Sequence, residues 1–439
     1  MAARRTSPER PPAGGAAAVR RAPFSDNPRV GARGQQTQQR ILDAALRVFG
    51  DDGFHGASVE RIAKLAGCSR VSFYQYFASK EDVFGHVAAQ LARQVSASTE
   101  ALDLLTPDLA GWTAMRAWVD RYTEIYARYE PVFHAYQAAV ESDETVALAV
   151  ARAGEDTVAK IRARFVATTL PARRLDPVIR VLLQVVNHTF DVVGILRTKA
   201  PDAYPDDRLQ VAITDVVHRT LFGRHDDVNV HDANGGPPPA LALGSIILDT
   251  PQHDDGTREQ GRALSALLGS ARDVFVERGY HATRVDDLVA AAGVSHGAFY
   301  RYFRGKDELA RVLTARAREA VAATLTELPD VLDLDPPAGR TALRRWLRRY
   351  NAAHAHEAGM LRVWVDAALQ DPALRAESAP PLDWGRRRMA RYLQPRGFGD
   401  LDMDAVVMVA LLGVFGPRQR SAAEVDAAAH VIERGLFGR

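Results

Sequence analysis

The sequence predicts an all-α protein built from two tandem units, each with an N-terminal helix-turn-helix head followed by a helical body. Three observations predict this architecture. A long segment of the first half recurs in the second, apolar residues recur at three- and four-residue steps, and no useful stretch alternates apolar and polar residues as a strand does. The length of 439 residues also exceeds what one compact core holds.

The internal repeat is the strongest of these observations. Residues 53–80 and residues 279–306 align without a gap at an offset of 226, and 11 of the 28 positions are identical. The tetrapeptide Leu-Phe-Gly-Arg also recurs, at 221–224 and at 436–439. Because the period is far longer than that of a solenoid repeat, we interpret the chain as a duplicated domain.

Composition divides the chain further. The first residues of the chain are rich in Pro, Gly, Ala and Arg, a composition that favours disorder. The stretch between the two copies is rich in Gly and Pro, which is typical of a linker. The predicted parts are a disordered basic arm (1–34), a first head (35–90), a first body (91–224), a linker (225–256), a second head (257–316) and a second body (317–439).

The first head begins with a predicted helix over residues 38–49, where Ile41, Leu42, Ala45, Val48 and Phe49 recur at helical spacing. Gly53 then provides a helix stop. Ser58 is expected to cap a short helix over residues 59–65, since a serine oxygen there can accept a hydrogen bond from the first turn.

The two copies share a glycine-containing turn that leads into another helix. It reads Ala-Gly-Cys-Ser at 66–69 and Ala-Gly-Val-Ser at 292–295. Ser69 and Ser295 are expected to cap the helix that follows. In the second copy Thr283 and Asp286 are expected to form a capping box at the start of the preceding short helix.

A helix, a tight turn and a second helix are the layout of a DNA-binding helix-turn-helix, whose second helix fits the major groove. The residues expected to face base edges are Arg70, Val71, Ser72 and Gln75 in the first copy and His296, Gly297, Ala298 and Arg301 in the second. The residues expected to contact phosphates are Tyr74, Tyr76 and Lys80, and Tyr300, Tyr302 and Lys306. Ser58, Ser69, Arg284 and Ser295 complete the predicted DNA-binding set. The alternative is a helical hairpin with packed aromatic residues.

This pattern resembles the DNA-binding domain of TetR-type (tetracycline-repressor-like) regulators. The shared motif is a helix with a Gly-aromatic stop, a short helix, Ala-Gly-Val-Ser, and an aromatic recognition helix followed by Lys80 or Lys306. The resemblance covers about fifty residues in each half. It implies operator DNA as partner, a small-molecule effector and a homodimer formed through four helices. Two heads in one chain, and Cys68 in place of the usual valine, depart from the pattern.

Two covalently joined heads suggest an internal pseudo-dimer. Four predicted apolar helices can form the joining bundle, over residues 176–197, 206–221, 404–415 and 421–436. Since the base-facing residues differ between the heads, we expect a non-palindromic operator with two unlike half-sites. A homodimer with four heads, and a helical scaffold whose second head no longer reads DNA, remain open.

An aromatic stripe in each body is the candidate lining of an effector chamber, with plain core packing as the alternative. The candidate residues are Trp118, Tyr122, Tyr126, Phe133 and Tyr136 in the first body and Trp346, Tyr350 and Trp364 in the second. Their apolar character favours a bulky hydrophobic effector.

Other classes of function find little support in the sequence. It contains no phosphate-cradling glycine loop, nucleophile elbow or credible acid–base pair, so we expect no enzyme, catalytic residue or cofactor. The single cysteine excludes an internal disulfide and a cysteine-based zinc site, and no metal site is expected. No run of eighteen apolar residues predicts a membrane span, and a cytoplasmic location is expected.

The net charge of +2 does not itself indicate a nucleic-acid partner, but residues 1–34 carry seven arginines against two acids. That arm lies along phosphates or in the minor groove, or is a solvated tail.

Overall fold

The computed structural model describes residues 31–142, 144–166, 168, 170–225, 228, 258–330, 336–415 and 420–439. Apart from one isolated bridge between Leu105 and Phe165, the regular structure of these residues is helical. Most of the predicted basic arm and of the predicted linker lies outside the described residues.

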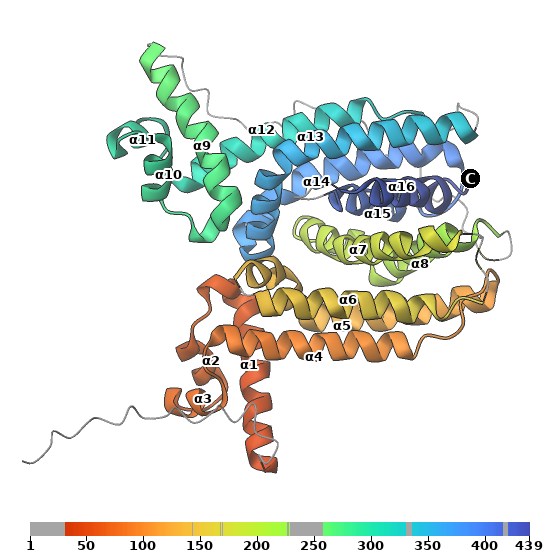
Figure 1. The fold of residues 1–439 in the computed structure, drawn as a ribbon, viewed down its shortest axis with the longest axis horizontal. Coiled ribbons are helices and arrows are strands. Elements are labelled where there is room, and N and C mark those ends of the chain that lie inside the picture. The colour runs from red at the N-terminus through yellow and green to blue at the C-terminus, as the bar shows by residue number, and fades with distance from the viewer. Residues whose placement is uncertain are drawn as a thin grey trace, which may run out of the picture.

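The two halves repeat the same order of helices (Figure 1). The first half contains α1 (Ala32–Gly56), α2 (Val59–Leu65), α3 (Arg70–Tyr76), α4 (Lys80–Glu100), α5 (Leu109–Ser142), α6 (Glu144–Arg162), α7 (Ala172–Leu196), the 3₁₀ turn η2 (Pro201–Ala203) and α8 (Asp206–Phe222). The second half contains α9 (Arg258–Ala282), α10 (Val285–Ala292), α11 (His296–Tyr302), α12 (Lys306–Thr326), α13 (Pro336–Gln370), α14 (Pro372–Leu393), the 3₁₀ turn η4 (Gln394–Arg396), α15 (Leu401–Gly413), α16 (Ala422–His430) and the π-helical turn η5 (Val431–Leu436).

Helices cross the expected boundaries of the heads. The first helix begins at Ala32, so the last residues assigned to the arm are helical. The boundaries expected near residues 90 and 316 fall inside α4 and α12. Each head is therefore joined to its body by a continuous helix.

The predicted serine caps form in both heads. The hydroxyl oxygens of Ser58, Ser69 and Ser295 accept hydrogen bonds from the first turns of α2, α3 and α11. Gly67 and its counterpart Gly293 have φ values of 66° and 64°, a left-handed conformation that a residue with a Cβ adopts only at a cost. The glycine in each turn is thus explained by the backbone path into the second helix.

The capping box expected from Thr283 and Asp286 is wrong. Helix α10 begins one residue later, so Arg284 is its N-cap, and the Asp287 carboxylate accepts a hydrogen bond of 2.9 Å from the Arg284 amide. The Thr283 side chain is buried and donates to the carbonyl oxygen of Gly279. Burial of Thr283 against the preceding helix thus removes it from the capping position.

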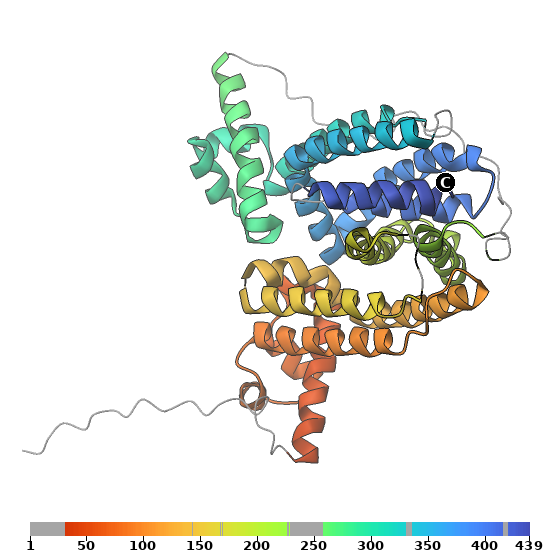
Figure 2. The same cartoon turned by 45° about the vertical axis from the view of Figure 1, so that its right-hand side comes forward.

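The predicted four-helix bundle joins the halves. Helix α7 packs on α15 and α16, and α8 packs on α15 and η5, within a single apolar core that contains residues of both bodies. The four elements lie together at the centre of the molecule, with the remaining body helices on either side (Figure 2). Burial of this shared apolar surface is the main force that holds the halves together.

A buried ionic cluster crosses the same junction. Arg219 of α8 donates a 2.8 Å hydrogen bond to the carbonyl oxygen of Gly435. Its guanidinium lies 3.4 Å from Asp215 and 3.5 Å from Asp404, and Asp404 also pairs with Arg396. Burial lowers the pKa of Arg219, although Asp404 and Asp215 oppose the shift. These charges are fully withdrawn from water, so the cluster depends on every partner remaining in place.

Helix α7 is long and apolar enough to cross a membrane by length and composition alone. Its apolar side chains are covered by α15, α16 and α14 in the central bundle, and most of them are buried. Packing between protein helices therefore accounts for its composition.

Candidate nucleic-acid interface

Each second helix of the helix-turn-helix is anchored by two phenylalanines. Phe73 and Phe77 are fully buried in the core of the first head, and Phe299 and Phe303 occupy the matching places in the second. The ring centroids lie 6.0 Å apart in the first pair and 5.8 Å apart in the second. This anchoring holds the opposite face of α3 and of α11 in a fixed direction, away from the core.

The residues predicted to face base edges lie on those outward faces. In the first head Arg70, Val71 and Gln75 are exposed, with 73% of Val71 accessible, and Ser72 is half-buried. In the second head the exposed residues are His296, Gly297 and Arg301, and Ala298 is half-buried. A groove-binding role thus requires no rearrangement of either head.

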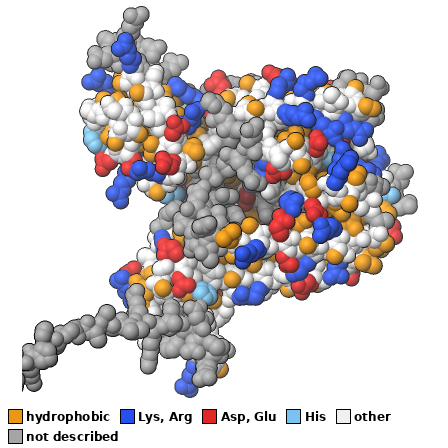
Figure 3. Space-filling view, in the orientation of Figure 1, with side chains coloured by type: hydrophobic (Ala, Val, Ile, Leu, Met, Phe, Trp, Pro, Cys, Tyr) orange, Lys and Arg blue, Asp and Glu red, His pale blue; other side chains and the backbone are white. Residues whose placement is uncertain are grey.

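The two heads occupy the same end of the molecule (Figure 1). The space-filling view shows a hollow between them and Lys and Arg side chains on both (Figure 3). Helices α3 and α11 thus lie at the outer parts of the two heads, on the same end of the molecule and separated by the hollow.

Sequence reasoning missed one acidic residue in each head. Arg70 NH1 lies 2.6 Å from Glu60 of α2, and His296 Nε2 lies 3.3 Å from Asp286 of α10. A hydrogen bond to Tyr74, and after it the charge of Glu60, raises the pKa of Arg70. Both pairs are exposed, so a ligand with its own acceptors can displace the carboxylates. The sequence did offer a signal for these pairs. Asp286 follows Glu60 by 226 residues, and His296 follows Arg70 by the same 226 residues, which is the offset of the repeat.

Lys80 and Lys306, which are predicted to contact phosphates, donate hydrogen bonds within their own heads. Lys80 Nζ donates to the carbonyl oxygens of Phe54 and Ala57 at 2.8 and 3.3 Å. Lys306 Nζ donates to those of Tyr280, His281 and Thr283 at distances from 2.9 to 3.3 Å. Both ammonium groups therefore satisfy carbonyls left over at the end of the head's first helix, and burial lowers the pKa of Lys306.

The predicted tyrosines divide into two kinds. Tyr74 and Tyr300 are exposed on the recognition helices. Tyr76 and Tyr302 are half-buried and pack against the apolar cores of their heads. Arg284 is exposed at the start of α10. Tyr74, Tyr300 and Arg284 thus have the accessibility that a DNA contact needs.

Cys68 lies in the turn between α2 and α3 and packs against the core of the first head. Burial raises the pKa of its thiol, although Arg40 opposes the shift. A raised pKa keeps the thiol protonated and unreactive. The packing of Cys68 against the core fits a small apolar residue of the turn.

The aromatic stripe of the first body is largely a packed network. Trp118 stacks on Tyr122 with ring centroids 5.0 Å apart, and Tyr122 donates a 2.6 Å hydrogen bond to Asn187. Tyr126 stacks on Phe133 at 4.9 Å and donates to Asp191. Tyr136 lies in α5, and its side chain is outside the described part of the chain. Trp118 also lines a cavity in this body.

That cavity is apolar and lies within the first body. Its volume is about 40 Å³. The lining comes from α5, α6, α7, α8 and the segment after α4, and includes Leu102, Met115, Trp118, Ile179 and Leu221. The buried indole N–H of Trp118 has no hydrogen-bond acceptor among the described residues.

The aromatic residues of the second body are hydrogen-bonded. The indole N–H of Trp346 donates to the carbonyl oxygen of Thr324 at 2.9 Å, and that of Trp364 donates to the Ser378 hydroxyl at 3.0 Å. Tyr350 approaches the carbonyl oxygen of Leu412 at 3.5 Å. Their polar atoms are thus used within the core. Within the described ranges, no group of three or more His, Cys, Asp or Glu side chains is placed to hold a metal ion.

The geometry defines a two-headed helix-turn-helix protein. Both heads match the model of the bacterial regulatory proteins of the tetR family, over residues 41–87 and 267–313. The chain therefore carries two tetR-family domains in tandem, and the resemblance drawn from the sequence is confirmed.

Three curated relatives show the same kinship. The chain is 39% identical over 71 residues to an uncharacterized HTH-type transcriptional regulator, YdgC of Bacillus subtilis, covering 16% of this chain and 36% of that protein. It is 43% identical over 53 residues to the HTH-type transcriptional regulator AcrR of Shigella flexneri, covering 12% and 25%. It is 33% identical over 106 residues to the HTH-type transcriptional repressor NicS of Pseudomonas putida, covering 23% and 48%. The chain thus spans between 25% and 48% of the length of these relatives.

Proposed function

We propose that the chain is a DNA-binding transcriptional regulator that reads its operator with the two heads of one molecule. The observation that carries this proposal is the pair of exposed recognition helices at one end of a molecule whose halves share a four-helix bundle. In a dimer of single-headed helix-turn-helix proteins, two-fold symmetry places two equal helices on successive half-sites. In this chain the two recognition helices would be placed on successive half-sites by the covalent link between the halves, without a second chain.

The operator of such a molecule has two unlike half-sites. Arg70 of the first head corresponds to His296 of the second, and Gln75 corresponds to Arg301. Arginine recognises guanine by a bidentate pair of hydrogen bonds, and glutamine recognises adenine in the same manner. Since the side chains on the two reading surfaces differ, a perfect inverted repeat would suit only one head.

The decisive experiment is the light-scattering mass of the protein on a DNA fragment from its own upstream region. One chain of 48.0 kDa per DNA supports the single-chain reader. Two chains per DNA would replace it with the second candidate, a homodimer with four heads. The absence of any salt-dependent complex would refute DNA reading and leave a helical scaffold.

Two matched variants test the unlike half-sites. Arg70→Ala and Arg301→Ala each remove one exposed side chain of one head. Selection of binding sites from random DNA should show relaxed specificity in one half-site for the first variant and in the other half-site for the second. Each lost base contact should weaken binding to the operator about tenfold. A selected site that is a perfect inverted repeat would refute this part of the proposal.

We also propose that a small hydrophobic effector binds in the first body. The apolar cavity beside Trp118 supports an apolar ligand, since its lining residues present only apolar surface. Small-molecule sites usually measure about 300–1,000 Å³, so this cavity must widen when such a ligand enters. Repression relieved by the effector is the proposed mode of action, supported by the similarity of this chain to NicS, a transcriptional repressor.

The effector site is tested with Nile red, an apolar dye that carries a carbonyl acceptor. Trp118→Phe should weaken dye binding several-fold, since it removes part of the indole surface that lines the cavity. Trp346→Phe is the matched control, because Trp346 is not among the residues that line this cavity. Equal dye affinity of both variants would count against a site beside Trp118.

A further inference from the structure

One helix of the second half contacts the first helix of both heads. Helix α13 packs on α9, which opens the second head. The same helix also packs on α1 of the first head and on α5 of the first body. Besides the central bundle, the halves are therefore joined next to the heads, through α13.

Each head approaches the long helix of its own body at a glycine. In the first half, a Cβ placed at Gly50 of α1 would lie 3.2 Å from Cγ of Pro131 in α5. In the second half the sizes are exchanged, and a Cβ placed at Gly359 of α13 would lie 2.5 Å from Cγ2 of Val276 in α9. Gly50 and Val276 are equivalent positions of the repeat, 226 residues apart. Each head is thus fitted closely to its own body, with the missing side chain on opposite sides of the two contacts.

Arg375 of α14 links α13 to α5 beside the first of these contacts. Its Nε donates a 3.3 Å hydrogen bond to the carbonyl oxygen of Ala368, near the end of α13. Its Nη1 lies 3.6 Å from Oε1 of Glu130 in α5. Glu130 directly precedes Pro131, the residue that faces Gly50 of the first head. A continuous series of contacts therefore runs from the second body to the first head.

The ion pair between Arg375 and Glu130 is partly withdrawn from water. The two side chains are 25% and 38% exposed. Nε2 of the buried His134 lies 3.7 Å from the same Glu130 oxygen. A pair with this exposure changes an equilibrium by at most about fivefold. Its loss is therefore expected to alter the placement of the heads and to leave the fold intact.

We propose that the Arg375–Glu130 pair, together with α13, holds the two heads at one separation, and that this separation fixes the number of base pairs between the half-sites of the operator. The inference rests on the proposed reading of DNA by both heads of one molecule. Recognition helices on one duplex must lie about one helical turn of DNA apart, roughly 34 Å, or a multiple of it. A firm connection between the heads converts this requirement into a preference for one spacing.

The first test varies the spacing of the half-sites. The operator selected from random DNA is lengthened or shortened between its half-sites by one or two base pairs, and the affinity of each duplex is measured by fluorescence anisotropy. The unaltered protein should discriminate strongly against the altered spacings. Glu130→Gln keeps the size of the side chain and removes its charge, so it should reduce this discrimination about threefold to fivefold. A merely structural weakening would instead lower all affinities by the same factor.

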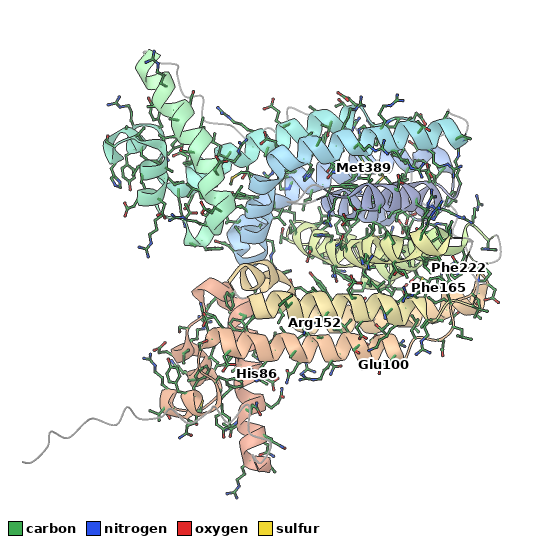
Figure 4. All side chains as sticks on the ribbon, viewed as in Figure 1. His86, Glu100, Arg152, Phe165, Phe222 and Met389 are labelled. Carbon is green, nitrogen blue, oxygen red and sulfur yellow. The ribbon has the colours of Figure 1, made fainter. Side chains whose placement is uncertain are left out.

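The matched control is Arg434→Gln. Arg434 of the second half donates a 3.2 Å hydrogen bond to the carbonyl oxygen of Phe222 in the first half. Phe222 lies at the end of the molecule away from the heads (Figure 4). This variant therefore loosens the halves far from the heads, and its ratio of affinities for the selected and altered spacings should equal that of the unaltered protein. The loss of a charge acts on every duplex alike and cancels in this ratio.

The second test needs no DNA. Spin labels on Gln75→Cys of α3 and Arg301→Cys of α11, in a Cys68→Ala background, report the distance between the heads by pulsed electron resonance. Glu130→Gln should broaden the distribution of distances, whereas Arg434→Gln should not. The proposal is overturned if Glu130→Gln keeps the full spacing preference, or if its distances stay as narrowly distributed as those of the control. Failure of every duplex to bind would refute the proposed function, and the spin-label distances would still decide whether the pair holds the heads.

Discussion

Replacing Asp404 with asparagine should weaken the junction between the two halves. The side chain of Asp404 is 1% exposed and pairs with Arg396 of its own half, which is equally buried. It also lies 3.5 Å from the fully buried guanidinium of Arg219 in the other half. Asparagine keeps the size of the side chain and removes the charge, so any loss of stability reports the ionic contacts.

The expected magnitude follows from the burial of the partners. Removal of one partner from a buried ion pair costs about 3–5 kcal/mol, because the remaining charge stays in a medium of low dielectric. Asp215 lies 3.4 Å from Arg219 and offsets part of this cost. We therefore expect a loss near the lower limit, about 3 kcal/mol in the free energy of unfolding.

Urea unfolding followed by circular dichroism measures this loss. The control is Arg208→Gln, which breaks an ion pair between the same two halves whose arginine side chain is 46% exposed. Exposed pairs contribute at most about 1 kcal/mol, so the control should stay close to the unaltered protein. If Asp404→Asn loses no more stability than Arg208→Gln, the buried cluster is not what fastens the halves, and the reasoning fails.

Three further predictions concern the heads and the effect of pH. Glu60→Gln frees Arg70 from its carboxylate partner, so affinity for operator DNA in a fluorescence-anisotropy titration should rise about twofold to fivefold; an unchanged affinity would show that Glu60 does not compete with DNA. Lys306→Met leaves three carbonyls without their donor and should destabilise the second head by about 1–3 kcal/mol, seen as an earlier thermal transition. The slope of log affinity against log salt should not change, whereas a flatter slope would show that Lys306 contacts a phosphate. His218 is buried and its pKa is lowered to about 4, so below about pH 6.5 the unfolded chain binds a proton that the folded chain does not. Stability should therefore fall between about pH 6.5 and about pH 4, and His218→Gln should lose less stability on acidification in urea unfolding than the unaltered protein.

The heads could be predicted from the sequence because their determinants are local. The glycine turn, the serine caps and the buried Phe73 and Phe299 lie within a few residues of one another, and the repeat displays each of them twice. Helical periodicity likewise indicated the four apolar helices that form the central bundle. Short-range spacing carries this information, since capping and amphipathic packing depend on neighbours within one or two turns.

Only the tertiary structure decided how individual polar groups are used. The position of Lys80 in the sequence does not reveal that its ammonium group donates to the carbonyl oxygen of Phe54, 26 residues earlier, because this contact depends on how α1 and α4 pack. Trp118 and Trp346 look alike along their helices, but only the indole N–H of Trp346 meets an acceptor. Such partners are brought together by packing, which no local pattern encodes.

At the junction between the two halves, too, the sequence showed the elements, and the packing decided their long-range contacts. The repeated Leu-Phe-Gly-Arg was visible in the sequence, but the sequence did not show that residues of both copies line one cavity between the halves. Arg219 meets Gly435 across 216 residues of chain, through a bundle whose register is set by apolar packing of α7 and α8 on α15 and η5. The sequence by itself determined the two heads and the helices that join the halves. The tertiary structure decided which charges those helices bury against each other, because long-range contacts arise only once the apolar core has aligned the elements that carry them.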